Sequence, residues 1–328
     1  MAMASYAILP LAVIGGLVVC KAIHTAYLFL TFHFLTPSQP LKAYKSPGTE
    51  SHALITGASG GIGLGIAQEL AHQGFGVILL GHISEELWEA AEDIRRQCPG
   101  AIVRTITMNA MTATESKMRK VVDALSDIRI SILVNNVGGN AIASPDFRHF
   151  NTYTFSDIDN VMNHNDRFMA RLTMLLLPHL QQKPTPSSKS LILTMASGGM
   201  IGLPSLVMYS ATKAFNHSFS IALARDLESD PETSHIDSLC VLPGDVHSQG
   251  NTQGLVPGTP KWDFYGRMIV RRADKAVERK MRVMTPWWKH AAQIAMLNFV
   301  PEGMLMKELN KVVEVKIKAW EEIYAKSK

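Results

Sequence analysis

Tyr209 and Lys213 lie four residues apart, a spacing that places both side chains on one face of a helix. Tyrosine is a weak acid with an ordinary pKa near ~10. A cation beside the phenol favours its ionised form and lowers that pKa, so such a pair can pass a proton to or from a carbinol oxygen near neutral pH. The same spacing also arises by chance, and an ordinary exposed helix face is the alternative interpretation.

Two further features precede this pair in the chain. Ser197 lies twelve residues before Tyr209 and follows the apolar run 191–193. A glycine-rich turn at 56–63 follows another apolar run much earlier. Because all three features occur in this order, we interpret Ser197, Tyr209 and Lys213 as one catalytic group.

The glycine-rich turn stands between an expected strand at 52–55 and an amphipathic helix that runs through His72. Glycines let the backbone approach a pyrophosphate, and the helix N-terminus adds amide donors and the positive end of its dipole. A glycine-rich turn without a ligand is the alternative. The residues that we expect to bind a dinucleotide here are Gly57, Ser59, Gly61, Ile62 and Gly63.

The next expected strand, 75–80, indicates which dinucleotide is bound. In a Rossmann unit, an acid at the end of this strand holds the ribose 2′-hydroxyl of NAD. Here the strand is followed by Gly81, His82, Ile83 and Ser84, and the first acid is Glu85. A carboxylate would repel a 2′-phosphate, so its absence favours NADP(H) over NADH. His82 or Ser84 is the expected phosphate ligand, with a partly exposed loop histidine as the alternative.

Apolar runs alternate with amphipathic segments over residues 50–250. We expect strands at 52–55, 75–80, 101–106, 130–134, 191–195 and 238–242, and helices at 85–97, 118–125, 157–180 and from Tyr209 onward. This order predicts an α/β fold with a doubly wound parallel sheet and a ligand site at the carboxyl ends of its strands.

Other polar residues follow these strands. Asn109 follows the third strand, where it could hydrogen-bond an adenine edge, and Asn135 and Asn136 follow the fourth, where they can cross-link neighbouring loops. The loop 243–248, which contains Val246 and Ser248, is suited to lie over a nicotinamide.

The N-terminus predicts a membrane anchor. Residues 3–20 carry no charge, Lys21 and His24 interrupt, and 26–35 are apolar again, which is long enough to cross a bilayer. We expect a retained anchor at 1–36, a linker at 37–48 and a catalytic domain at 49–328. A cleaved signal peptide and a hairpin broken near Lys21 are the alternatives. Lys42 and Lys45 follow the anchor and predict a cytosolic catalytic domain.

Composition excludes several classes of protein. Three cysteines at long spacings argue against a disulfide framework and fit a reducing compartment. No metal-ligand spacing and no nucleic-acid motif is present, so we expect no metal site and no nucleic-acid partner.

The C-terminal third offers two open interpretations. The basic run 267–282 is interpreted either as a contact for anionic lipid headgroups or an acidic ligand, or as a solvated basic helix face. The methionine- and tryptophan-rich segment at about 246–305 reads as a substrate lid with an apolar tunnel near the bilayer, or as simple core packing.

Five motifs in the same order resemble the short-chain dehydrogenase/reductase family over residues 50–250: Thr56-Gly57-x3-Gly61-x-Gly63, Asn135-Asn136-x-Gly138, Ser197, Tyr209-x3-Lys213 and Pro243-Gly244-x-Val246. The resemblance implies a Rossmann-type fold and hydride transfer between a nicotinamide and a carbonyl carbon.

The resemblance also implies roles for single residues. Tyr209 would donate the proton, Ser197 would polarise the carbonyl, and Lys213 would lower the Tyr209 pKa and hold the nicotinamide ribose. Asn165, thirteen residues before Pro178, would hold a water that links Lys213 to solvent, with Asn163 as the alternative.

A narrower resemblance covers the N-terminal segment, residues 134–138 and the tail 285–302. These are similar to the group of very-long-chain 3-oxoacyl-CoA reductases and 17β-hydroxysteroid dehydrogenases of the endoplasmic reticulum membrane. Two positions depart from the pattern: His82 replaces the group's usual arginine, and Asn109 replaces the wider family's aspartate.

The sequence therefore predicts a single-pass protein of the endoplasmic reticulum membrane, with the possibility of a homo-oligomer. The expected activity is NADPH-dependent reduction of a carbonyl on a lipophilic substrate, which could be a 3-oxoacyl-CoA, a steroid or a secondary-metabolite ketone. The alternatives are an oxidising, NAD-using alcohol dehydrogenase and a non-catalytic, cofactor-binding membrane scaffold.

Overall fold

The computed structural model describes residues 2–35, 37, 41–142, 145–297 and 299–326. The chain forms two compact units, residues 1–39 and 40–328.

The N-terminal unit is a single long apolar helix, as its sequence predicts. Helix α1 (Ala2–Leu30) continues into the π-helical turn η1 (Thr31–Leu35). The segment Ala12–Leu35 has 24 residues and a mean hydropathy of 1.8. None of its most apolar 18-residue stretch is buried. By length and composition it is a candidate transmembrane span.

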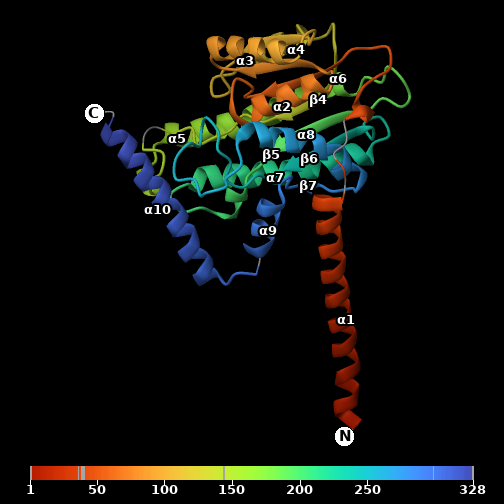
Figure 1. The fold of residues 1–328 in the computed structure, drawn as a ribbon, viewed down its shortest axis with the longest axis vertical. Coiled ribbons are helices and arrows are strands. Elements are labelled where there is room, and N and C mark those ends of the chain that lie inside the picture. The colour runs from red at the N-terminus through yellow and green to blue at the C-terminus, as the bar shows by residue number, and fades with distance from the viewer. Residues whose placement is uncertain (1, 36, 38–40, 143–144, 298, 327–328) are drawn as a thin grey trace. The chain divides into compact units, whose positions relative to one another are not determined.

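The second unit is built on a parallel sheet with the strand order β3-β2-β1-β4-β5-β6-β7 (Figure 1). Its strands are β1 (Ser51–Thr56), β2 (Gly76–Gly81), β3 (Val103–Thr107), β4 (Arg129–Asn135), β5 (Ser190–Met195), β6 (Ile236–Val241) and β7 (Val283–Met284). The chain adds β2 and β3 on one side of β1 and then returns to add β4 to β7 on the other side. This change of direction between β1 and β4 creates the crevice where α/β sheets bind ligands.

Helices cover both faces of this sheet. Their bounds are α2 (Gly61–His72), α3 (Ser84–Gln97), α4 (Glu115–Asp123), α5 (Phe155–Met162), α6 (Phe168–Leu180), α7 (Val207–Ser229), α8 (Trp262–Glu278), α9 (Trp288–Leu297) and α10 (Glu302–Lys326). Helices α4, α6 and α7 share one apolar core with the central strands, while α2 packs against α3 and α8. The predicted doubly wound α/β fold is confirmed.

The central strands are buried along their whole length. Every residue of β1, β2, β4 and β5 is buried. Because helices cover both faces, these strands read as continuous apolar runs rather than alternating patterns. This is why the sequence located the strands to within about two residues.

The structure adds two features to the sequence-based expectation. The single helix expected at 157–180 is α5 and α6 with a π-helical turn, η4 (Asn163–Arg167), between them. Helix α6 ends at Leu180, as the sequence predicts, with Pro178 in its last turn. The segment expected as a lid contains α8, β7 and α9, and α10 follows it.

The basic run 267–282 is largely engaged within this unit. Arg271 Nε lies 2.7 Å from the Glu69 carboxylate of α2, and Lys275 Nζ lies 2.7 Å from Glu278. Arg282 pairs with Glu228 of α7. These pairs favour the structural interpretation of the run over a contact with lipid headgroups.

Helices α2 and α8 cross at two glycines. A Cβ on Gly266 would lie 2.5 Å from the backbone carbon of Gly65, and a Cβ on Gly65 would lie 2.8 Å from the Trp262 carbonyl oxygen. Such approach distances are possible only without side chains. The crossing brings the start of α8 and the loop that precedes it close to the glycine-rich turn at the start of α2.

We therefore expect Gly266→Ala to lower the free energy of unfolding by about 1–3 kcal/mol through overpacking. Gly303→Ala is the matched control, because this helical glycine has no described atom near its missing Cβ. The control should be neutral or stabilising by up to about 1 kcal/mol. Denaturant unfolding of both variants measures the difference; equal stability would contradict the close crossing.

Candidate active site

The predicted site residues come together at the carboxyl edge of the sheet. The glycine-rich turn follows β1, His82 follows β2, Asn136 follows β4, Ser197 follows β5 and the loop 243–248 follows β6. Helix α7 carries Tyr209 and Lys213 beside this edge. The strand ends thus assemble a site from segments that are far apart in the chain.

Ser197 and Tyr209 meet across a glycine. The Ser197 hydroxyl oxygen accepts the Gly199 N–H at 3.0 Å. A Cβ on Gly199 would lie 3.2 Å from Cε1 of Tyr209 and 3.4 Å from the Ser197 oxygen, so the glycine permits this approach. Burial raises the pKa of Tyr209, and a hydrogen bond with the Ser197 side chain lowers it.

Lys213 is a buried cation, with 5% of its surface exposed. Its ammonium donates to the Met195 carbonyl oxygen at 3.3 Å and lies 5.8 Å from the centroid of the Tyr209 ring. Burial lowers the pKa of Lys213 to about 8, against the opposing attraction of Asp166. The sequence-based interpretation assigned the lowering of the Tyr209 pKa to Lys213; in the structure Ser197 is the neighbour that lowers it.

Asn165 links the loop after β4 to helix α7. Its side-chain oxygen accepts the Gly139 N–H at 2.9 Å. Its amide nitrogen donates to the Gly139 carbonyl at 3.0 Å and to the Thr212 hydroxyl at 2.8 Å. A Cβ on Gly138 would lie 2.7 Å from the Lys213 ammonium and 3.0 Å from the Asn165 oxygen. Asn165 therefore lies beside the buried lysine.

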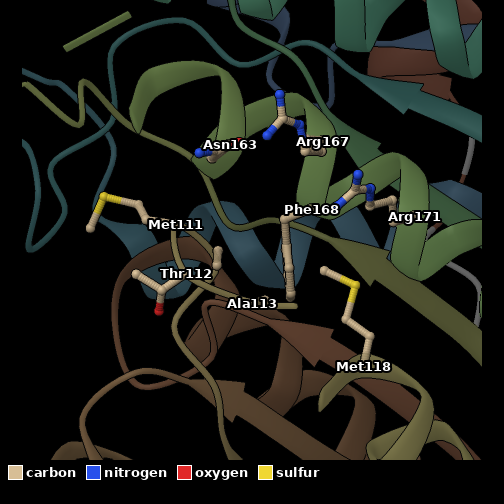
Figure 2. A pocket seen from close by; sticks show the side chains of 9 residues that line it. Met111, Thr112, Ala113, Met118, Asn163, Arg167, Phe168 and Arg171 are labelled. Carbon is tan, nitrogen blue, oxygen red and sulfur yellow. The ribbon is translucent and has the colours of Figure 1, made fainter. Parts of the chain in front are cut away.

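Asn163, the alternative to Asn165, lies elsewhere. It lines a cavity of about 150 Å³ between η4, the start of α6 and the loop after β3. Figure 2 shows it with Arg167, Phe168 and Arg171 on one side and Met111 to Ala113 on the other. The geometry favours Asn165 for the position beside Lys213.

The sequence did not point to two titratable residues on η4, Asp166 and His164. Asp166 has a buried Oδ1 without a hydrogen-bond partner among the described residues, and burial raises its pKa to about 7. Burial, together with the smaller effects of the Lys213 and His82 charges, lowers the pKa of His164 to about 4. The polar run 163–167 inside an otherwise apolar helix could have indicated these residues. A regular helical period does not show that their side chains face inward, because the π-helical turn changes the spacing.

The glycine-rich turn has the shape of a phosphate cradle. Gly57 and Gly61 have φ angles of 64° and 57°, which favour glycine. A Cβ on Gly63 would lie 2.1 Å from the Gly57 carbonyl oxygen. Asn136 holds this turn, because its amide nitrogen donates to the carbonyl oxygens of Thr56 and Gly57 at 3.0 and 3.1 Å.

The start of helix α2 completes the cradle. Its N-cap is Gly60, which has no side chain to cap the first amides of the helix. Ser59 and Ile62 lie in the same turn and are half-buried. Unsatisfied amides and the helix dipole are the donor set that an anion such as a pyrophosphate requires.

The loop after β6 approaches this cradle. A Cβ on Gly61 would lie 3.5 Å from Cβ of Ser248, and the Gln249 amide oxygen lies next to Gly60. Val246 is buried, and its carbonyl accepts the Asn251 amide at 3.0 Å. Gln249 was not predicted, because nothing in the sequence shows that its side chain turns back to the glycines.

The residues expected at the adenosine end are more exposed. His82 and Ser84 are exposed, and the Ser84 hydroxyl donates to the Glu85 carboxylate at 3.0 Å. The Asn109 side-chain oxygen accepts the Met111 N–H at 2.9 Å, which leaves its amide group as a donor. Among the described residues, no three His, Cys, Asp or Glu side chains gather as metal ligands would.

Comparison with known proteins agrees with this geometry. A family model described as short chain dehydrogenase matches residues 51–254. The very-long-chain 3-oxoacyl-CoA reductase of Kluyveromyces lactis is 29% identical over 263 residues, which are 79% of this chain and 73% of the relative. The enzyme of the same description from Pyricularia oryzae is 28% identical, over 86% of this chain and 82% of the relative.

Two solved structures have the same fold. The short-chain dehydrogenase of Sphingobium yanoikuyae in complex with NADPH superposes with a TM-score of 0.60 at 25% identity, covering 78% of this chain and 95% of its own. The bulky-bulky ketone specific alcohol dehydrogenase of Comamonas testosteroni gives a TM-score of 0.57 at 24% identity, covering 76% and 95%.

The buried carboxyl of Asp166 makes stability depend on pH. Folding raises its pKa from 3.8 to about 7, so the native state binds the proton more tightly than the unfolded chain. Stability is then lost as the pH rises from about 4 to about 7. Lys213 stays largely protonated over this range, because its pKa is about 8.

Asp166→Asn should remove this loss. The free energy of unfolding of the variant should gain on that of the wild type as the pH rises from about 4 to about 7. Urea unfolding at several pH values measures the difference, with the exposed Asp159→Asn as control. Parallel pH profiles for wild type and Asp166→Asn would show that the carboxyl is not titrating there.

Proposed function

The chain belongs to the short-chain dehydrogenase family and is an NAD(P)-dependent oxidoreductase acting on a carbonyl or hydroxyl group, and from this premise we propose that it is an NADPH-dependent reductase of lipophilic carbonyl compounds. The observation that carries the proposal is the assembly of Ser197, Tyr209 and Lys213 beside a phosphate cradle. These three residues supply a polarising hydroxyl, an acid and a buried cation, which carbonyl reduction needs together.

The substrate that we propose is a long-chain 3-oxoacyl thioester. The relatives described above carry that activity in their names and match most of this chain. Apolar side chains border Ser197, since Met200 and the α9 residue Ile294 pack on the buried cluster of Ala196, Cys240 and Leu242. An apolar border of this kind suits an acyl chain, and it would also accept a steroid or a secondary-metabolite ketone.

Tyr209 and Ser197 would act on the same substrate oxygen. The Ser197 oxygen accepts the Gly199 N–H, so its own hydrogen, which bonds Tyr209 in the structure, is the group that would turn to a carbonyl and polarise it. Tyr209 is protonated at neutral pH, because its burial raises its pKa, and it is therefore available as the proton donor. The proton passes from the phenol to the oxygen as that oxygen gains negative charge.

Lys213 and Asn165 would support this transfer. The charge of Lys213 stabilises the phenolate left on Tyr209, and the lysine also holds the ribose of the nicotinamide. Asn165 keeps the Gly139 loop against α7, and its side-chain oxygen has a second lone pair for a water that returns protons. Asp166, whose pKa is about 7, is a further proton-binding group near this lysine.

The cofactor residues follow from the same edge of the sheet. Gly57, Ser59, Gly61, Ile62 and Gly63 would bind the pyrophosphate, and Asn109 and Asn136 would border the adenosine. Tyr209, Lys213, Val246 and Ser248 would border the nicotinamide. When bound, the nicotinamide supplies the hydride.

The preference for NADPH rests on His82 and Ser84. Both side chains are exposed, with His82 just after β2 and Ser84 at the start of α3; the His82 ring is open to a 2′-phosphate, whereas the Ser84 hydroxyl donates to Glu85. Glu85 is the observation that favours the NADH alternative, because its carboxylate already engages the Ser84 hydroxyl. We propose NADPH because the carboxylate is on the first turn of α3 and not at the strand end.

The proposed location is the endoplasmic reticulum membrane, with residues 1–36 as a single-pass anchor, 37–48 as a linker and 49–328 as a cytosolic catalytic domain. The candidate span Ala12–Leu35 supports the anchor. Lys42 and Lys45 support the cytosolic side.

Tyr209→Phe tests the proton donor. The variant should lose at least about 100-fold in kcat, since a positioned general acid contributes about that much or more. NADPH affinity, measured by fluorescence titration, should change little, because the ring is kept. Turnover close to that of the wild type would contradict the role of Tyr209.

His82→Asp tests the cofactor preference. A carboxylate at the end of β2 should raise the Kd for NADPH about tenfold or more through charge repulsion and leave the Kd for NADH nearly unchanged. Glu85→Gln is the converse control and should tighten NADPH binding. A wild-type protein that already prefers NADH would overturn the assignment of His82.

A further inference from the structure

Helices α9 and α10 meet at an exposed apolar turn. In Figure 1 the two helices extend from the sheet-containing part of their unit and are joined at their far ends. We call residues 296–306, apart from residue 298, the apolar tip. Its most exposed side chains are Phe299 at 87%, Met296 at 67%, Met304 at 61% and Met306 at 39%.

This exposure is unusual in its concentration. Single apolar residues on a surface are common, but four large ones within eleven residues form a patch that normally marks an interaction site. The sequence from 291 to 306 contains one charged residue, Glu302, which begins α10. The patch therefore combines exposed apolar side chains with a single charged residue.

Turns within the tip bond four of its backbone amides. The Phe299 N–H donates to the Met296 carbonyl at 3.0 Å, and the Val300 N–H donates to Leu297 at 3.3 Å. The N–H groups of Met304 and Leu305 donate to the Pro301 carbonyl at 2.9 and 3.0 Å. A turn with bonded amides can enter a low-dielectric environment without the cost of unpaired donors.

Basic and aromatic residues flank the apolar tip along the chain. Lys289 and Lys307 are exposed and stand just outside the apolar segment. The Lys289 ammonium lies 5.3 Å and 5.8 Å from the ring centroids of Trp287 and Trp288. Tryptophan and lysine at the border of an apolar segment are typical of the headgroup region of a bilayer.

We propose that the apolar tip docks into the lipid bilayer, as a contact of the catalytic unit additional to the N-terminal span. Phe299, Met296 and Met304 enter the acyl boundary, and Lys289 and Lys307 bind the headgroups. A lipid surface is favoured over a second copy of the chain because the flanking charges are both positive and because Ala12–Leu35 is itself a candidate span. A chain tethered to a bilayer meets that surface at high effective concentration, so a small patch suffices.

Helix α9, which leads into the apolar tip, also reaches the candidate active site. The His290 ring nitrogen Nδ1 accepts the N–H of Gly244, in the loop after β6, at 3.1 Å. One turn later, Ile294 lies 3.7 Å from the Cβ position of Gly198, the neighbour of Ser197. Helix α9 therefore connects the catalytic serine to the tip within about two turns. If the proposed function holds, an acyl chain dissolved in the bilayer reaches Ser197 along α9.

The experiment uses the full chain in phosphatidylcholine vesicles, with and without phosphatidylserine. Cys20→Ser and Cys98→Ser remove the two accessible thiols, while Cys240 is buried. An environment-sensitive fluorophore is attached at Phe299→Cys or, as a matched control, at Phe155→Cys, where the native phenylalanine is 90% exposed on α5. Lipids that carry a nitroxide near the headgroup then quench whichever label they contact.

Quenching at position 299 should exceed that at position 155 by about twofold or more, because an interfacial segment sits about 5–10 Å into the headgroup and acyl boundary. Phosphatidylserine should increase the difference through Lys289 and Lys307. Equal and weak quenching at both positions would overturn the docking of the tip.

A second measurement separates this inference from the proposed function. With the fluorophore moved to Met304→Cys, the Phe299→Glu substitution should reduce quenching to the level at position 155. This result does not depend on which substrate the enzyme reduces. Phe299→Glu should also raise the KM for a bilayer-dissolved 3-oxoacyl thioester with little change in kcat or in NADPH affinity. Lipid contact without turnover of any carbonyl would leave the docking in place and contradict the reductase.

Discussion

The burial of the Lys213 ammonium is the constraint on which the candidate site depends. A charge at 5% exposure loses most of its hydration, and its pKa of about 8 reflects that loss. The protein offsets the loss with the Met195 carbonyl and the nearby Asp166 carboxyl. A Cβ on Gly138 would lie 2.7 Å from the ammonium, so a side chain there would displace the lysine. The loop after β4, the π-turn and helix α7 are all arranged around this one cation.

The sheet supplies the rest of the arrangement. Parallel strands end at one edge, so the turn after β1, the asparagines after β4, Ser197 after β5 and the loop after β6 converge without direct sequence proximity. Side-chain hydrogen bonds then fix these loops to one another: Asn136 holds the glycine turn, Asn165 holds Gly139 and Thr212, and His290 holds Gly244. The loops of the site are therefore bonded to segments that are distant in the chain as well as within themselves.

The sequence predicted the parts that depend on local pattern. Strands buried on both faces appear as apolar runs, and the glycine turn, Ser197, Tyr209 and Lys213 are recognisable by type and spacing. The π-turn was missed because one extra residue per turn changes which side chains face inward, so Asp166 and His164 had no periodic signal. The crossing of Gly65 with Gly266, the approach of Gln249 and the exposure of Phe299 depend on contacts between distant segments, which a single sequence does not encode visibly.

We propose that this chain reduces a lipophilic carbonyl with NADPH. The most direct measurement incubates the purified full-length protein in vesicles with NADPH deuterated at the transferable nicotinamide position and a long-chain 3-oxoacyl-CoA. Mass spectrometry of the product then reports where the deuterium goes. The account predicts a 3-hydroxyacyl-CoA with one deuterium on its hydroxyl-bearing carbon. Tight NADPH binding with no deuterium in the product of this or any other apolar ketone would contradict it and indicate a cofactor-binding scaffold.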